Sequence, residues 1–284
     1  MKRKILLPTD FSKSAWHAIH YALELYKDDE CIFYILNIFS ATNNIFESLL
    51  NMEPGSELYE TKKENSEKGL GKVLDMILFN DQSNPKHVFK TISVFNNPVE
   101  AIKNSVEEKD IEIIVMGTKG ETNSKKSAFG SIAIQVMEKV RNCPVIVVPE
   151  EAVHTMPKEI VFPTSYKTHF KRRELQYLID IAKKCHATIE IVHISEEEKL
   201  SETQANNKKR LEEYFEEVNW SFHSLPHHSV ESAVNLFIES RKSDMVAFIN
   251  KKHALFGSVF VQPMVKEFGF NSRVPILVMH DLRN

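Results

Sequence analysis

Cysteine, glycine and long apolar runs are scarce in this sequence of 284 residues. Its cysteines, Cys31, Cys143 and Cys185, lie far apart without a C-x-x-C spacing, which argues against a disulfide framework or a zinc site and favours reduced, packed thiols. No apolar stretch approaches the roughly 18 residues of a membrane span, so we expect no membrane association. The apolar run behind the basic N-terminus ends at Pro8, too early for a signal peptide. We therefore expect a cytoplasmic protein.

Charge of one sign is not in excess either. Lys and Arg number 36 against 39 Asp and Glu, for a net charge of -3, which argues against a nucleic-acid partner. The hydrophobic content of 42% is that of a globular protein. The length fits two compact domains of about 140 residues each.

Short β-rich runs alternate with longer amphipathic stretches in the first half, a pattern typical of a parallel sheet with helical crossovers. A helix is expected to begin near Ser12, because apolar residues recur behind it at helical spacing. Asn97 as N-cap and Pro98 as first helical residue predict another helix, running to about Glu108. The strands are expected at residues 4–9, 32–38, 88–94, 111–116 and 145–148.

The stretch between the second and third predicted strands divides into two parts. Residues 40–55 are polar and lack periodicity, so we interpret them as a mobile surface loop. The charged stretch from about Glu57 to Phe79 is predicted to be helical.

The same order of elements begins again after a polar stretch near residue 150. K-I-L-L-P-T-D at 4–10 reappears as E-I-V-F-P-T-S at 159–165, and P-V-I-V-V at 144–148 reappears as P-I-L-V-M at 275–279. Such self-similarity indicates an internal duplication of five strands and four helices. The predicted division is a first domain at 1–150, a linker at 151–158 and a second domain at 159–284.

The candidate binding residues of the first half follow its fourth predicted strand. They are Gly117-Thr118-Lys119-Gly120 and, after an intervening loop of nine residues, Gly130-Ser131. Glycines between a strand and a helix let the backbone approach a ligand with its N–H groups turned inward. Ser131 is suited to cap the following helix, whose exposed N–H groups and dipole would hold an anion such as a phosphate chain. Lys119, Lys125 and Lys126 would add positive charge. Plain turn and cap roles for these glycines remain open on this pattern alone.

This glycine spacing, together with Pro-Thr-Asp-Phe-Ser at the end of the first strand, resembles the universal stress protein family. The resemblance covers essentially the whole chain as two copies. It implies an α/β fold of two tandem domains, Rossmann-like and of the adenine nucleotide alpha hydrolase type, each with a five-stranded parallel sheet in the order 3-2-1-4-5 flanked by helices. That order creates a crevice between strands 1 and 4, where Asp10 and Gly117 would face each other.

The resemblance also implies a cofactor, ATP, with or without Mg²⁺. Asp10 would recognise the adenosine end, and the backbone near Ile38 would contact the adenine. The ribose and phosphates would be surrounded by Gly117, Gly120, Gly130, Ser131 and Ile132. If no ligand binds, Asp10 is instead the N-cap or a turn acid before the first helix. Replacing Gly117 with valine is expected to abolish ATP binding without loss of folded content.

The second domain departs from this pattern, and the loop before its Gly257-Ser258 is shorter. At the position of Gly117 this half has Ile249. A β-branched isoleucine cannot easily take the backbone angles open to glycine, and its side chain would fill space near the ribose. We expect no ATP in this half, although Gly257-Ser258 could hold a small anion. The replacements are Ser165 for Asp10, Ile249 for Gly117 and Lys252 for Gly120.

Histidines in the second half do not form a recognisable metal motif. Metal ligation needs three or four converging ligands, and no short spacing here enforces that convergence, so no metal site is expected. We interpret these histidines as polar loop residues; they are His193, His223, His227, His228, His253 and His280.

The sequence as a whole indicates a regulatory or stress-response ATP-binding protein with an unidentified protein partner. The loop offers no general base or oriented nucleophile, so catalysis is not expected beyond slow ATP hydrolysis or autophosphorylation at Thr122 or Ser127. A structural interaction module with a vestigial nucleotide site is the other alternative. The strand at 145–148 is expected to pair with 276–279 in an intramolecular pseudo-dimer. A further homodimer stays open.

Overall fold

The computed structural model describes residues 2–39, 54–80, 84–118, 131–195, 199–226, 229–250 and 272–281. Most of the predicted loop at 40–55 lies outside these ranges. So does the stretch 251–271, where a fourth helix of the second half was expected.

The first half alternates strands and helices as predicted, and the predicted strand ends are correct to within two residues. The helices at Ser12 and Asn97 and the long helix from Glu57 are confirmed. The elements are β1 (Arg3–Pro8), α1 (Lys13–Leu25), β2 (Cys31–Phe39), α3 (Glu57–Asn80), β3 (His87–Phe95), α4 (Pro98–Lys109), β4 (Ile113–Gly117), α5 (Ser131–Lys139) and β5 (Val145–Val148).

The second half repeats this alternation in its described part. Its elements are β6 (Glu159–Thr164), α6 (Arg172–Cys185), β7 (Thr188–Ile194), α7 (Glu202–Tyr214), β8 (Asn219–Leu225), α8 (Val230–Arg241), β9 (Met245–Asn250) and β10 (Ile276–His280). The predicted linker at 151–158 falls between β5 and β6.

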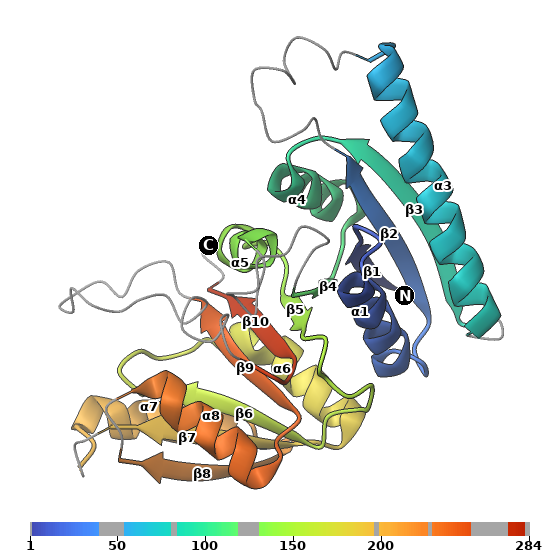
Figure 1. Ribbon diagram of the computed structural model, residues 1–284. Coiled ribbons are helices and arrows are strands. Elements are labelled where there is room, and N and C mark those ends of the chain that lie inside the picture. Colours follow the sequence, from blue (N-terminus) through green and yellow to red (C-terminus); the bar gives the residue numbers. More distant parts are fainter. Residues whose placement is uncertain are drawn as a thin grey trace.

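Ten strands of the described chain form one continuous sheet in the order β3-β2-β1-β4-β5-β10-β9-β6-β7-β8. Each half therefore has the predicted order 3-2-1-4-5, and its neighbouring strands run parallel. The halves meet where β5 and β10 pair antiparallel, with Ile146 opposite Leu277. The expected intramolecular strand pairing is confirmed, and Figure 1 shows this seam in the middle of the molecule.

The core consists of two apolar layers, one on each face of the sheet. Side chains alternate between faces along a strand, so Ile5 and Leu7 join one layer and Leu6 joins the other. Helices α1, α3, α6 and α7 cover the first face, and α4, α5 and α8 cover the second. Each layer runs through both halves, and burying each such aliphatic side chain contributes about 1.5–3 kcal/mol.

Local capping explains where two of these helices begin. The Ser12 hydroxyl accepts the Ala15 N–H at 3.2 Å before α1. The Asn97 side chain accepts the Val99 N–H at 3.0 Å before α4, with Pro98 at the first helical position. Each cap satisfies an N–H that the helix cannot, and contributes about 1 kcal/mol.

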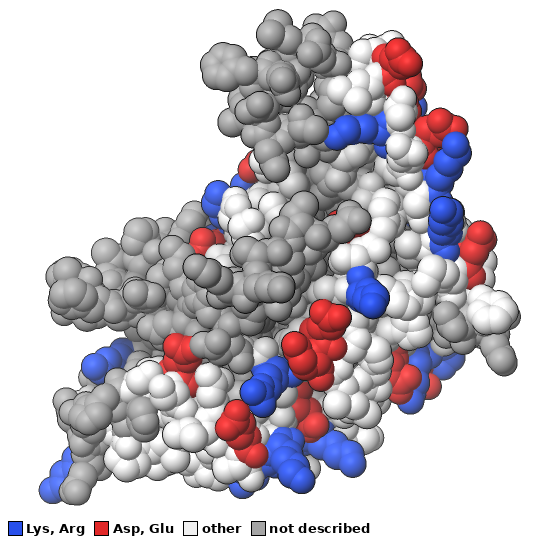
Figure 2. All heavy atoms as spheres, in the orientation of Figure 1, with Lys and Arg blue, Asp and Glu red and all other residues white. Residues whose placement is uncertain are grey.

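Cysteines and charges behave as the composition predicts. All three cysteines are free thiols, and Cys31 and Cys143 are buried. On the face seen in Figure 2, basic and acidic side chains of the described residues are interspersed, which fits the near-neutral charge balance. Within the described ranges, no helix combines the length and the apolar character needed to cross a bilayer.

Candidate functional site

The carboxyl ends of β1 and β4 lie side by side at the point where the strand order reverses. Ile5 lies opposite Ile113, and Leu6 lies opposite Ile114. Continued along the strands, this register brings Thr9, the residue before Asp10, level with Gly117. Open α/β sheets bind ligands at such a position, because adjoining loops turn away to opposite faces there.

Asp10 takes part in a tight turn between β1 and α1. Its carboxylate accepts the Ser12 N–H at 3.1 Å, and the Thr9 hydroxyl accepts the Phe11 N–H at 3.0 Å. Phe11 has a φ of 66°, and the buried Asn37 amide donates to the Thr9 carbonyl at 2.7 Å. The Asp10 carboxylate thus stabilises the turn before α1, which is the role expected of it if no ligand binds.

Gly117 ends β4 against the first turn of α1. A Cβ atom on Gly117 would lie 2.6 Å from the Ser14 hydroxyl and 2.7 Å from the Ser14 carbonyl carbon and oxygen. Because two of these atoms belong to the main chain, the helix would have to shift. The expectation that Gly117→Val leaves the fold intact is therefore wrong: this glycine has a packing role that needs no ligand.

A milder substitution measures that packing role. Gly117→Ala is expected to lower the free energy of unfolding by about 1–3 kcal/mol, because overpacking displaces α1 from β4. Gly71→Ala is the matched control: a Cβ at Gly71, inside α3, meets no atom within 4 Å, so higher helix propensity should stabilise the protein by up to about 1 kcal/mol. Urea denaturation of the ligand-free proteins measures both, and equal effects would contradict the proposed contact.

The remaining predicted site residues are only partly described. Ile38 is half-buried at the second-last position of β2. Ser131 and Ile132 are the first two residues of α5 and both are exposed, Ile132 to 38%. Gly120 and Gly130 lie outside the described residues, as do the lysines and hydroxyl residues of that loop.

The described groups offer two kinds of recognition. Asp10 supplies a carboxylate acceptor at the end of β1, suited to a sugar hydroxyl. The first N–H groups of α5 have no partner within the helix and lie at the positive end of its dipole, so they suit an anion. A carboxylate that can accept from a sugar hydroxyl, together with amides that can donate to an anion, suits a sugar phosphate as ligand.

At the equivalent position of the second half stands a buried isoleucine. Gly117 pairs with Val148 in the first half, and Ile249 pairs with Met279, the counterpart of Val148, in the second. Ile249 is only 7% exposed. The connection from β6 to α6 runs from residue 165 to 171, whereas that from β1 to α1 runs only from residue 9 to 12. The second half thus holds a buried side chain at the position where the first half has no room for a Cβ atom.

Aromatic side chains occupy the end of β6. Ser165, the counterpart of Asp10, accepts the Lys167 N–H at 3.4 Å. Tyr166 has a φ of 55°, like Phe11, but its ring is buried and stacks on His193 with centroids 4.7 Å apart. A ring nitrogen of His193 lies 3.0 Å from the Thr164 carbonyl. This edge of the second half therefore keeps the turn but fills it with packed rings.

Three of the supposed loop histidines are strand residues, so that prediction is wrong for them. His193 is buried in β7, and His280 is buried at the end of β10. His223, in β8, lies 2.5 Å from the buried Glu190 carboxylate. His227, His228 and His253 fall outside the described residues. In the part of the chain that the structure describes, no three His, Cys, Asp or Glu side chains could together hold a metal ion.

Sequence reasoning missed the charged cluster around Glu190. This carboxylate accepts hydrogen bonds from Ser221 and, at 2.8 Å, from Arg241, which also pairs with Glu159 at 2.7 Å. Burial works to raise the pKa of Glu190, but the hydrogen bonds of Ser221 and His223 and the charge of Arg241 outweigh it and lower the pKa. A glutamate within the apolar run of β7 was the available signal. The cluster lies near the amino ends of β6 and β7, away from the crevice.

Comparisons with known proteins agree with this architecture. Universal stress protein MJ0577 of Methanocaldococcus jannaschii is 31% identical over 166 residues, covering 52% of this chain and 95% of that protein. A universal stress protein from Archaeoglobus fulgidus DSM 4304 has a TM-score of 0.69 with 19% identity, and the match covers 97% of each chain. The Archaeoglobus fulgidus protein thus shares the fold of both halves.

A universal stress protein solved in complex with cAMP is 17% identical, with a TM-score of 0.34, and the match covers 51% of this chain and 96% of that one. The model of the universal stress protein family itself matches residues 1–149, from before β1 to just after β5. This chain belongs to the universal stress protein family.

Proposed function

We propose that this protein is a cytoplasmic regulatory protein of the stress response that binds ATP in its first half, between the carboxyl ends of β1 and β4. One observation carries the proposal: the two halves differ at equivalent positions of the crevice. The first half combines Asp10 with Gly117, whereas the second combines Ser165 with the buried Ile249. The chemistry expected of a nucleotide site is thus confined to one half.

Each group in the first half has a distinct role in this proposal. The Asp10 carboxylate accepts a hydrogen bond from a ribose hydroxyl, and the backbone beside Ile38 contacts the adenine. The amides of Ser131 and Ile132, with those of Gly120 and Gly130, donate to the phosphates. Bound ATP supplies a triphosphate, accompanied by Mg²⁺ where that ion is present, and its occupancy sets the surface offered to a protein partner.

An alternative is an interaction module with a vestigial site. The Asx turn of Asp10 and the contact of Gly117 with Ser14 favour it, because each accounts for its residue without a ligand. The nucleotide content of the purified full-length protein separates the two functions. About one adenine nucleotide released per chain on denaturation, or saturable binding in an ATP titration, supports the proposed site. No release and no binding would favour the vestigial one.

A reciprocal exchange tests the role of Asp10. Asp10→Ser keeps a side-chain oxygen for the turn, as Ser165 does, but removes the carboxylate. We expect ATP affinity to fall at least about tenfold, the usual loss for one hydrogen bond to a charged group. Calorimetric titration measures the affinity, and thermal unfolding checks the fold.

The matched variant is Ser165→Asp, which places a carboxylate at the same turn of the second half. It should leave the stoichiometry of ATP binding unchanged, because Ile249 still fills the space opposite. A second ATP per chain in Ser165→Asp, or unchanged affinity in Asp10→Ser, would contradict the assignment of these residues.

A further inference from the structure

A glycine near the middle of α3 lies against the aromatic ring of the turn that contains Asp10. A Cβ atom on Gly69 would lie 2.4 Å from the Cζ atom of Phe11 and 2.6 Å from its Cε2 atom. Any side chain at position 69 would therefore overlap with this ring. Glycine is unfavourable inside a helix, so the contact with Phe11 supplies the packing reason for Gly69 that helix propensity does not.

Helix α3 gives this ring a fixed surface to rest on. One stripe of the helix, with Leu70, Val73 and Ile77, is buried in the core. The Ser66 hydroxyl lies 2.7 Å from the Ser93 hydroxyl of β3, and Figure 1 shows α3 running along that strand. The contact at Gly69 therefore connects the turn after β1 with a helix that is anchored on the sheet.

Phe11 is the central residue of the Asp10 turn. The Asp10 carboxylate accepts the Ser12 N–H at 3.1 Å, so the hydrogen bond closes a loop that contains Phe11. The backbone of Phe11 has a φ of 66°, a left-handed conformation that is disfavoured for a bulky side chain. Such conformations persist where the surrounding structure holds them. A shift of Phe11 would therefore redirect the Asp10 carboxylate.

The second half attaches its equivalent helix, α7, to the equivalent turn by buried hydrogen bonds. The Gln204 amide donates to the Ser165 carbonyl at 2.9 Å, and the Asn207 amide donates to the Tyr166 carbonyl at 2.8 Å. Both amide side chains are buried. Phe11, by contrast, is 43% exposed and meets α3 through an apolar ring. This contact can shift at a smaller cost than two buried hydrogen bonds.

We propose that Phe11 is a positioning residue: docked against Gly69 of α3, it directs the Asp10 carboxylate toward the nucleotide, so that ATP binding and the docking of α3 stabilise each other. The inference rests on the proposed ATP site between β1 and β4. Such coupling is reciprocal, because a contact that favours the ATP-binding conformation of the turn is itself favoured by bound ATP. Helix α3 is then an element of the first half that responds to the nucleotide.

Gly69→Ala tests the contact, and Gly71→Ala in the same helix is its matched control. Both substitutions raise helix propensity, but a Cβ at Gly71 meets no atom within 4 Å. Calorimetric titration of the full-length protein should show ATP affinity falling at least about fivefold in Gly69→Ala and staying unchanged in Gly71→Ala. Both variants should stay folded, because the exposed ring of Phe11 can turn away from the added methyl group.

Phe11→Ala removes the ring itself and should lower ATP affinity to a similar extent. In that background Gly69→Ala should have little further effect, because no ring remains to be displaced. Amide hydrogen exchange supplies a readout that a merely structural contact would not change. Bound ATP should slow exchange in α3 of the wild-type protein and of Gly71→Ala, but not of Gly69→Ala.

Three results would overturn this inference while leaving the ATP site in place. They are unchanged ATP affinity in Gly69→Ala, additive losses in the double variant with Phe11→Ala, and hydrogen exchange in α3 that does not respond to ATP. If the wild-type protein binds no ATP, the proposed function itself fails, and the positioning role of Phe11 fails with it.

Discussion

The protein is expected to lose stability as the pH falls from 7 to 4, and replacing His280 with leucine should make this loss about 3 kcal/mol smaller. His280 is 5% exposed, and burial, followed by the charge of Arg141, lowers its pKa to about 4 despite the nearby Asp281 carboxylate. In the unfolded chain the ring takes up a proton near pH 6.5. As the pH falls below that value, proton binding favours the unfolded chain, so stability declines until the folded protein is also protonated.

The leucine variant should have nearly normal stability at pH 7, because within the described residues neither ring nitrogen of His280 forms a hydrogen bond of normal geometry, although the Asn250 backbone lies close enough to raise the pKa of the ring. Urea denaturation at a series of pH values measures the slope. Met279→Leu changes the neighbouring residue of β10 without removing a titrating group, and serves as control. If His280→Leu keeps the wild-type slope, groups such as Glu190, whose lowered pKa also makes acid destabilising, carry the effect instead.

Arg241→Met is expected to lower the free energy of unfolding by about 3 kcal/mol. The substitution leaves Glu190, which is 3% exposed, without the cation that neutralises it, and deprives Glu159 of the same partner. A buried carboxylate that loses its ion pair is far more costly than a surface charge. Urea denaturation at neutral pH measures the loss.

The control for Arg241→Met is Lys103→Met, which breaks an exposed pair with Glu100 on α4 and should cost less than about 1 kcal/mol. Adding Glu190→Leu to Arg241→Met should restore part of the loss, since an apolar pair can replace a buried ion pair. Equal effects of the two single substitutions would show that the Glu190 cluster contributes no more than a surface pair.

Local sequence patterns predicted much of the fold. Ser12 and Asn97 begin helices through hydrogen bonds within three residues, so the sequence contains the whole cause. Apolar runs such as 145–148 are buried on both faces, which identified them as interior strands of a parallel sheet. The repeat of these runs predicted matching strands in the second half, whereas the strand order and the pairing of β5 with β10 were predicted from the family resemblance.

The crevice was predictable for a related reason. A glycine after a buried strand and an acid after another are local signals, and a family-like spacing relates them to one crevice. The equivalence of Ile249 with Gly117 also follows from aligning the two halves, and the sheet register agrees with it. The alignment could not show that Gly117 packs against Ser14 of α1. This contact makes the glycine necessary for packing, whether or not a ligand binds there.

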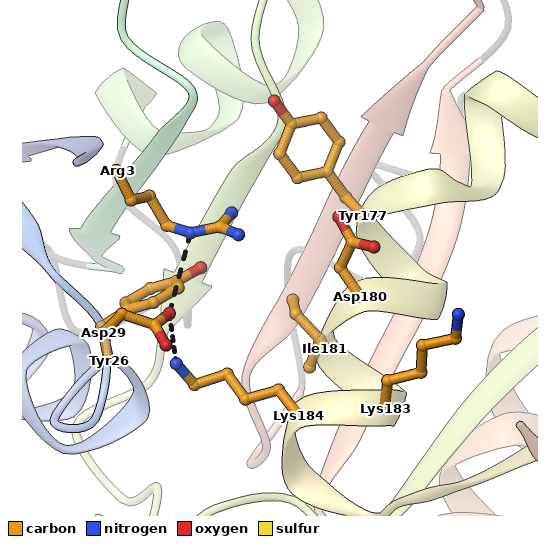
Figure 3. A pocket seen from close by; sticks show the side chains of 8 residues that line it. All are labelled: Arg3, Tyr26, Asp29, Tyr177, Asp180, Ile181, Lys183 and Lys184. Carbon is orange, nitrogen blue, oxygen red and sulfur yellow. Dashed lines mark ion pairs between the residues drawn. The ribbon is translucent and has the colours of Figure 1, made fainter. Parts of the chain in front are cut away.

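The sequence by itself therefore determined the helices and strands of the described residues and the repeat, because periodicity, caps and spacing act over short stretches. The order of the strands was predicted from the family resemblance, and the nucleotide-binding residues stay a prediction. The tertiary structure alone decided which polar side chains are buried and what they contact. Glu190 meets Arg241 across 51 residues, and Arg3 lines one cavity with Tyr177 of α6 (Figure 3). Burial and pairing at such separations depend on how helices dock on the sheet, and no local pattern records that geometry.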